Sequence, residues 1–198
     1  MQHQMVFQKF VCIFSLAAAI LFFVLGLGYS TDLYTLYYFI DPTSFVYVEG
    51  SQVYYDVQDF NRALVLYAVI LIVLAGVCFM MLNNTRRKYY ITNYVSSVVY
   101  AGFAGFLSYY VYTNSVAYKE QFLTGVDFDT WQMWVEMFPN DFQMTRSTFW
   151  FDAGKISAVV GIIAVVLVIV NLVWKTIWMK KEKAAMKGYK AVSEGGTV

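Results

Sequence analysis

Residues 156–174 read ISAVVGIIAVVLVIVNLVW, a stretch without a charged side chain between Lys155 and Lys175. About 20 mainly apolar residues are needed to cross a hydrocarbon core roughly 30 Å thick. Residues 10–28, 63–82 and 91–113 meet the same test, although residues 91–113 also carry Thr, Asn, Ser and Tyr. The sequence therefore predicts an all-α integral membrane protein, a bundle of four transmembrane helices in which residues 91–113 lie deepest.

The composition supports this fold class. Of 198 residues, 60% are hydrophobic and 14% are charged, whereas soluble domains carry roughly 45–50% and about 25%. A net charge of +1 excludes a nucleic-acid binder that relies on bulk basic charge. His3 is the single histidine, which excludes a histidine-based zinc or haem site within one chain. We expect one membrane domain over residues 1–198.

The charges are divided between the two sides of the predicted bundle. Residues 1–9, 83–90 and 175–198 hold ten basic and two acidic residues, a net charge of +8. The outer loops, residues 29–62 and 114–155, hold four basic and eleven acidic residues, a net charge of −7. Loops rich in Lys and Arg stay in the cytoplasm. The sequence therefore predicts a multi-pass protein of the plasma (inner) membrane with both termini cytoplasmic.

The two outer loops are rich in aromatic residues and carry different predicted elements. Residues 43–48 and 52–57 flank a Gly-containing turn, and this pattern predicts a β-hairpin in the first loop. In the second loop, Asp127 or Asp129 can cap a short helix over residues 130–138. Its aromatic face could rest at the membrane interface, cover the bundle or bind a partner. The predicted outer-surface interface comprises Tyr47, Tyr54, Trp131, Trp134 and Phe138.

Other aromatic and basic residues match the expected membrane boundaries. We assign Tyr34, Tyr37, Tyr38 and Phe39, together with residues 149–151, to the outer aromatic belt. Trp174 and Trp178 occupy the corresponding inner positions. The basic tail over residues 175–198 follows, and four of its lysines are candidate anchors on membrane lipid: Lys180, Lys181, Lys183 and Lys187.

Small residues recur at four-residue spacing in two of the predicted spans. They are Ser97, Ala101 and Gly105 in one and Ala153, Ser157 and Gly161 at the start of the other. Such spacing lets helix backbones approach closely in lipid. The pattern is compatible with packing inside one bundle and also with a face that meets a helix of another chain.

Polar residues in the third span form a possible path. Asn93, Ser97, Tyr100 and Ser108 fall on one side of a helix and could line a channel. All four predicted spans lack an ionisable side chain, and ion-coupled carriers usually need one. We expect the side chains of Asn93 and Asn171 to form hydrogen bonds between helices. We expect boundary ion pairs from Arg62 to Asp59 and from Lys155 to Asp152.

No catalytic motif or cofactor motif occurs in the sequence. Asp127, Asp129, Glu136 and Asp141 could bind a divalent cation, but their spacing matches no loop motif. We therefore expect no enzyme and no cofactor. The leading hypothesis is a non-catalytic membrane subunit that positions or regulates a transporter or envelope-assembly complex. The alternative is a small homo-oligomeric channel lined by the third helix.

Overall fold

The structure is a computed structural model, and it describes residues 2–83 and 91–194. Four long helices form its body: α1 (Gln2–Thr31), α2 (Val53–Asn83), α3 (Ile91–Gly125) and α5 (Phe149–Glu194). The 3-10 helix η1 (Tyr34–Phe39) and the short helix α4 (Phe128–Met137) complete the elements. The part of the chain that the structure describes is all-helical and contains no strand. The basic residues Arg86, Arg87 and Lys88 lie outside the described residues.

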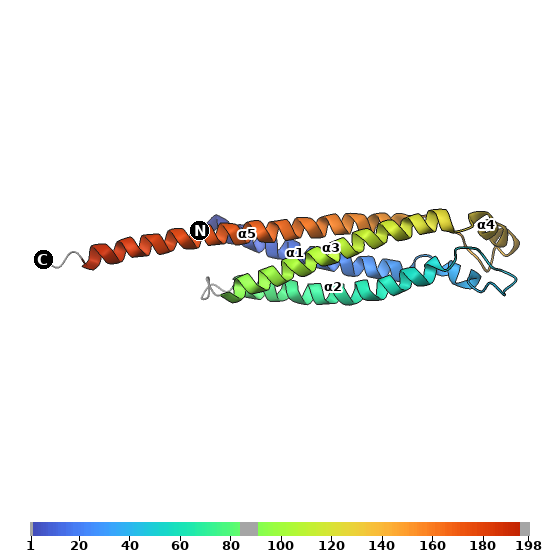
Figure 1. The fold of residues 1–198 in the computed structure, drawn as a ribbon, viewed down its shortest axis with the longest axis horizontal. Coiled ribbons are helices and arrows are strands. Elements are labelled where there is room, and N and C mark those ends of the chain that lie inside the picture. Colours follow the sequence, from blue (N-terminus) through green and yellow to red (C-terminus); the bar gives the residue numbers. More distant parts are fainter. Residues whose placement is uncertain (1, 84–90, 195–198) are drawn as a thin grey trace.

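The four long helices lie side by side in an up-and-down bundle (Figure 1). Helix α1 packs against α2 and α5, and α3 packs against the same two helices. Both chain termini lie at one end of the bundle, whereas η1 and α4 lie at the other (Figure 1). Helix α5 continues past this bundle toward the C-terminus.

Three described segments are long and apolar enough to cross a membrane: His3–Phe39, Val53–Leu82 and Phe149–Glu182. The chain is therefore a membrane protein. Helix α3 does not belong to this set, because its serines, threonines and asparagines lower its mean hydropathy. The expected set of spans is thus confirmed for three helices, while the role of α3 needs a separate argument.

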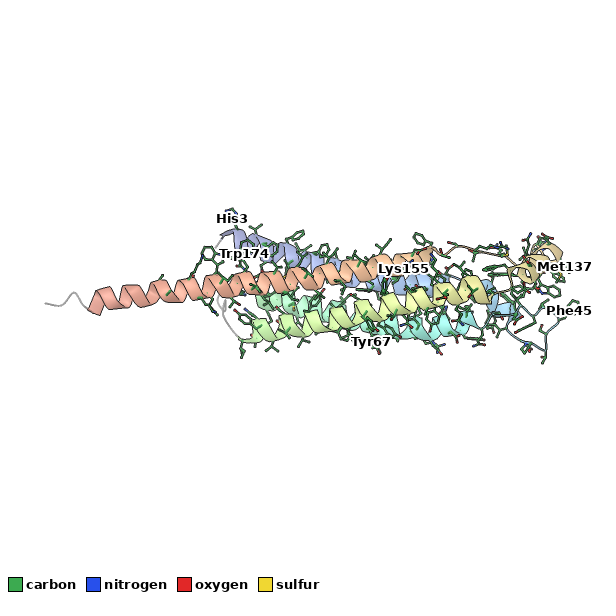
Figure 2. The ribbon with its side chains drawn as sticks, turned by 45° about the horizontal axis from the view of Figure 1, so that its top comes forward. His3, Phe45, Tyr67, Met137, Lys155 and Trp174 are labelled. Carbon is green, nitrogen blue, oxygen red and sulfur yellow. The ribbon has the colours of Figure 1, made fainter. Side chains whose placement is uncertain are left out.

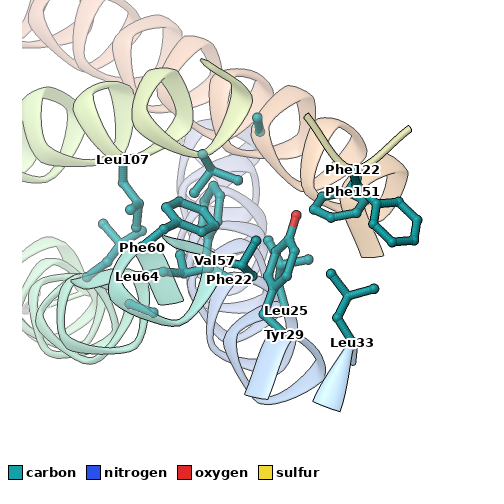
Figure 3. Packing of buried hydrophobic residues seen from close by; sticks show 14 of the residues in the cluster. Phe22, Leu25, Tyr29, Leu33, Val57, Phe60, Leu64, Leu107, Phe122 and Phe151 are labelled. Carbon is teal, nitrogen blue, oxygen red and sulfur yellow. The ribbon is translucent and has the colours of Figure 1, made fainter. Parts of the chain in front are cut away.

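The bundle core consists of large apolar side chains from all four helices. Phe22 and Leu25 of α1 meet Phe60 and Leu64 of α2, with Leu107 of α3 close by (Figure 3). These residues recur at three- and four-residue intervals, so each helix buries one stripe. Their neighbours on the outer faces are also apolar, as expected for helices that contact lipid rather than water.

The predicted β-hairpin is wrong. Residues 42–52 form turns, and Val53 already begins α2. The buried residues here follow a helical spacing: Val53, Val57, Phe60 and Leu64. Val53 and Val57 alone, four residues apart, also fit the alternating pattern of a strand. The turn itself is real, because Gly50 has a φ of 79° and a side chain there would overlap the backbone of Gly125.

The predicted helix in the second outer loop is confirmed as α4. The Asp127 carboxylate accepts hydrogen bonds from the backbone N–H groups of Asp129 and Thr130, at 3.1 Å each. These bonds occupy donors that a helix N-terminus otherwise leaves free. Helix α4 ends at Met137, shortly before Pro139.

Candidate functional site

The turns and short helices at one end of the bundle form a folded cap, which we call the lobe (residues 32–52 and 126–148). Trp131 of α4 is fully buried, and its ring contacts those of Phe39 and Phe128. Trp134 contacts the ring of Phe45 and donates a hydrogen bond to the backbone oxygen of Tyr47 at 3.4 Å. The lobe therefore has an aromatic core that holds α4 against the first loop.

This packing changes the interface expected from the sequence. Trp131 and Trp134 face the core of the lobe, so they have no surface to offer a partner. Tyr47 and Phe138 are exposed and Tyr54 is half-buried. The buried part of the aromatic face of α4 packs against the first loop.

An exposed cluster of five tyrosines lies beside this cap, and we call it the tyrosine patch: Tyr34, Tyr37, Tyr38, Tyr54 and Tyr55. Three come from η1 and two from the first turn of α2. Seven pairs of these rings are in contact, with centroids 5.4 to 6.3 Å apart for six of them and 6.4 Å apart for the seventh. All except Tyr54 are between 40% and 51% exposed. The sequence predicts an aromatic belt for Tyr34, Tyr37 and Tyr38 and an interface for Tyr54, but only the fold brings the start of α2 beside η1 and joins them in one cluster.

Carboxylates flank the patch on both of its segments. Asp32 precedes Tyr34 by two residues, Asp41 follows η1, and Asp56 follows Tyr55 directly. Thr43 donates two hydrogen bonds to the Asp41 carboxylate, which lowers the pKa of Asp41. Asp56 accepts a hydrogen bond from Gln121 at 3.2 Å. None of these three carboxylates forms an ion pair with a basic residue in the described chain.

Opposite the lobe, the bundle contains a layer of buried polar side chains: Gln4, Gln8, Asn93, Asn171 and Lys175. The Gln4 amide donates to Gln8 and to Asn171 at 3.3 Å each, and Gln8 donates to the Leu82 carbonyl. Lys175 is only 6% exposed, and it has no ion pair within the described residues. Lys175 is the first residue of the basic tail predicted over residues 175–198. Lys175 follows Asn171 by four residues, so the two side chains lie on the same face of the helix. This spacing could have predicted that both are buried.

The predicted polar path lies inside a single chain. Asn93, Ser97, Tyr100 and Ser108 are all buried. The Ser97 and Ser108 hydroxyls donate to backbone oxygens one turn earlier, at 2.8 and 2.7 Å. The Tyr100 hydroxyl donates to the Ser15 carbonyl of α1 at 3.1 Å. Backbone oxygens within the packed bundle therefore satisfy these three hydroxyls.

The two small-residue seams differ in their surroundings. In α5, Ser157 and Gly161 are buried and Ala153 is half-buried; a side chain at Gly161 would overlap Ser108 and Phe22. In α3, Ser97 is buried, Ala101 is half-buried, and nothing lies within 4 Å of the position that a Cβ on Gly105 would take. The α5 seam thus packs inside the bundle, whereas the α3 seam turns outward at Gly105.

Both predicted boundary ion pairs are present. Arg62 lies 3.3 Å from Asp59, and Lys155 lies 2.5 Å from Asp152. Lys119 of α3 adds a third partner, 2.7 Å from Asp152, and Thr148 donates to the same carboxylate at 3.0 Å. Lys119 was missed because it is far from Asp152 in sequence. The network joins the outer ends of α3 and α5.

The acidic residues considered for a cation have other roles in the structure. Asp127 caps α4, and the Thr130 hydroxyl and amide lower its pKa by hydrogen bonding to the carboxylate. Asp129 lies 4.0 Å from Arg146. No group of three possible metal ligands comes together among the residues that the structure describes.

The basic tail is described in part. Lys180 and Lys181 are exposed on α5, and the Lys181 ammonium lies 5.8 Å from the centre of the Trp178 ring. The side chains of Lys183 and Lys187 lie outside the described part of the chain. The lipid anchor therefore remains a prediction.

Comparisons of the chain with protein-family models, curated proteins and solved structures find no match. Any function must therefore be argued from the residues and their geometry.

Proposed function

We propose that this chain is a four-span, non-catalytic membrane subunit that binds a larger membrane complex, such as a transporter or an envelope-assembly complex. The single observation that carries the proposal is the tyrosine patch. Exposed tyrosines are enriched in protein interfaces, where they supply large contact areas. Four of these five tyrosines are exposed beside one another, three on the lobe and Tyr55 at the start of α2.

The relative register of α3 and α5 supports α3 as the fourth span. Gly154 of α5 faces Ser115 of α3, and Gly161 faces Ser108. Residues 156–174 of α5 therefore lie beside residues 95–113 of α3. In that part of α3 every exposed residue is apolar, aromatic or glycine: Val95, Val98, Val99, Gly102, Phe106, Tyr109 and Tyr112. Its polar groups face inward, so a low mean hydropathy is compatible with a lipid-facing surface.

The position of Tyr54 along α2 supports a patch that reaches beyond the aromatic belt predicted for Tyr34, Tyr37 and Tyr38. Tyr54 precedes Ala63, where the apolar stretch of α2 begins, by nine residues, which is about 13 Å along a helix. The headgroup zone is only about 5–8 Å thick on each side. Lys155 and Trp174 mark the two ends of the apolar stretch of α5, and the lobe residues Phe45 and Met137 lie well beyond Lys155 (Figure 2). We infer that the patch lies on the water side of the headgroup zone, where a protein partner can reach it.

The alternative function, a homo-oligomeric channel, has weaker support. Such a pore would run between chains and needs exposed polar residues at membrane depth. Ser97, Tyr100 and Ser108 are instead buried within one chain. The distribution of charge supports an orientation with the acidic lobe outside and both termini in the cytoplasm.

The experiment is purification of the tagged full-length chain in native nanodiscs from its own host. The patch variant is Tyr37→Ser with Tyr38→Ser, and the control is Met137→Ser, an exposed lobe residue outside the patch. We expect a partner of fixed stoichiometry that is lost from the patch variant and kept by the control. A homo-oligomer without another protein, or a partner that the patch variant retains, would overturn the proposal.

A further inference from the structure

We propose that the tyrosine patch and its flanking carboxylates bind a cationic segment of the partner protein, an extended stretch rich in arginine or lysine. This inference rests on the proposed function, because it names the chemistry of the partner's contact segment.

The first argument is the charge of the outer segments. Residues 29–62 and 114–155 carry a net charge of −7. Their four basic residues, Arg62, Lys119, Arg146 and Lys155, each have a carboxylate of the same chain within 4.0 Å. Those ion pairs use Asp59, Asp129 and Asp152, so eight of the eleven acidic residues have no basic partner among the described residues. This excess favours a basic ligand over an anionic one.

The second argument is where the unpaired acids lie. Asp32, Asp41 and Asp56 each fall within three residues of a patch tyrosine. Asp32 is half-buried near the end of α1, and Asp41 is exposed next to η1. Hydrogen bonds from Thr43 keep the Asp41 carboxylate charged through the physiological range. Asp41 therefore adds exposed negative charge next to the tyrosines of η1 along the chain, whereas the Asp56 carboxylate accepts a hydrogen bond from Gln121 of α3.

The third argument is the chemistry of the rings. The face of an aromatic ring attracts a cation, and tyrosine is among the residues that do so. Tyr34 and Tyr37 are nearly parallel, with 6° between their planes, while Tyr38 stands almost perpendicular to both. A guanidinium can stack on such a ring and also form paired hydrogen bonds with a neighbouring carboxylate. Arginine therefore fits the patch better than a compact ammonium.

A lipid headgroup is the other source of a cation, but the observations favour a protein segment. Tyr54 lies about 13 Å beyond the apolar stretch of α2 along the helix, farther than the headgroup zone of its own membrane extends. The experiment below also measures binding to lipid alone, with empty nanodiscs.

The test uses the full chain in nanodiscs of zwitterionic phosphatidylcholine. The probes are fluorescently labelled ten-residue peptides of alternating Arg and Gly, Lys and Gly, or Glu and Gly, and empty nanodiscs measure binding to lipid. We expect fluorescence anisotropy to show binding of the Arg peptide, weaker binding of the Lys peptide and none of the Glu peptide. Binding should weaken as salt rises from 0.05 to 0.5 M, because the added ions screen the attraction between the carboxylates and the basic peptide.

Matched variants assign the binding to the patch. Tyr37→Ser with Tyr38→Ser should weaken binding by about 4- to 25-fold, at about 2- to 5-fold for each ring. Asp41→Asn with Asp56→Asn removes two charges but keeps hydrogen-bonding groups, and it should also weaken binding. Glu136→Gln removes one charge on the exposed face of α4, away from the patch residues in sequence, and should change the affinity by less than about 2-fold.

The outcomes separate this inference from the proposed function. Equal loss of affinity for Glu136→Gln and for the patch variants, or binding to empty nanodiscs alone, would overturn the patch as the cation site. If no basic peptide binds while the co-purified partner still depends on Tyr37 and Tyr38, the cationic segment is wrong and the proposed function stands. If the partner also survives the patch variant, both are wrong.

Discussion

Gly161 and Gly105 are both helical glycines, and their surroundings predict opposite effects of one added methyl group. At Gly161 the methyl would overlap the Ser108 hydroxyl and the Phe22 ring, whereas at Gly105 it meets open space. We expect Gly161→Ala to lower the free energy of unfolding by about 1–3 kcal/mol. Gly105→Ala should leave it unchanged or raise it by up to about 1 kcal/mol. Unfolding of the detergent-solubilised protein by increasing SDS measures both, and equal effects would contradict the assigned seam.

Lys175 is a buried cation in the polar layer, without an ion-pair partner in the described chain. Burying an ion costs several kcal/mol, so a residue of similar volume without charge should be tolerated. We expect Lys175→Met to raise the free energy of unfolding by about 1–4 kcal/mol in the same assay. Asn171→Leu serves as the contrast, since it removes the acceptor of Gln4 and should destabilise the layer. A loss of stability in Lys175→Met would show that the ammonium has a favourable partner.

At the scale of elements, the attachment of α4 to the lobe depends on Trp131. Its ring is fully buried, while its indole N–H has no hydrogen-bond partner within the described residues. Trp131→Ala should therefore lower the free energy of unfolding of the lobe by about 3–5 kcal/mol, because it removes packed side-chain atoms. Trp131→Phe should lower it by less than about 1.5 kcal/mol. Hydrogen exchange is expected to accelerate in residues 128–137 of the Ala variant and stay slow in residues 156–174. Equal acceleration in both segments would mean that lobe and bundle unfold together.

The N-terminus of α4 gives a pH dependence of known sign. Hydrogen bonds lower the pKa of Asp127 in the folded protein below the usual value near 4. The cap therefore stabilises α4 fully above about pH 4, and this contribution is lost as the pH falls through the lowered pKa. Asp127→Ala should cost about 1 kcal/mol at pH 7 and progressively less below pH 4. Asp127→Asn keeps a capping side chain that does not titrate, so the stability of this variant should not depend on pH through this position.

The elements that sequence patterns could predict were those fixed by local chemistry. The capping residue and aromatic spacing of α4 predicted its position closely, and the spacing of three residues predicted the ion pair of Asp152 with Lys155. The start of α2 was mistaken for a strand, because Val53 and Val57 fit both a helix and a short alternating run. Only their packing with Phe60 and Leu64 decides for the helix.

For the whole molecule, the amount of apolar sequence could be predicted, but the surroundings of the polar groups could not. The sequence gives four similar stretches, yet it does not show whether Asn93 and Ser108 face a channel or a neighbouring helix. The tyrosine patch and the Lys119 contact with Asp152 likewise join distant segments. These features depend on the register between helices, which tertiary packing fixes.

The four-span arrangement requires α3 to cross the membrane, which places the lobe and the chain ends on opposite sides. The direct measurement is labelling by a membrane-impermeant maleimide in a background of Cys12→Ala and Cys78→Ala. On intact cells, Glu120→Cys should be labelled, Thr92→Cys should be labelled only after permeabilisation, and Val98→Cys should stay unlabelled in both states. Labelling of the variants at 92 and 120 from the same side would contradict the four-span arrangement.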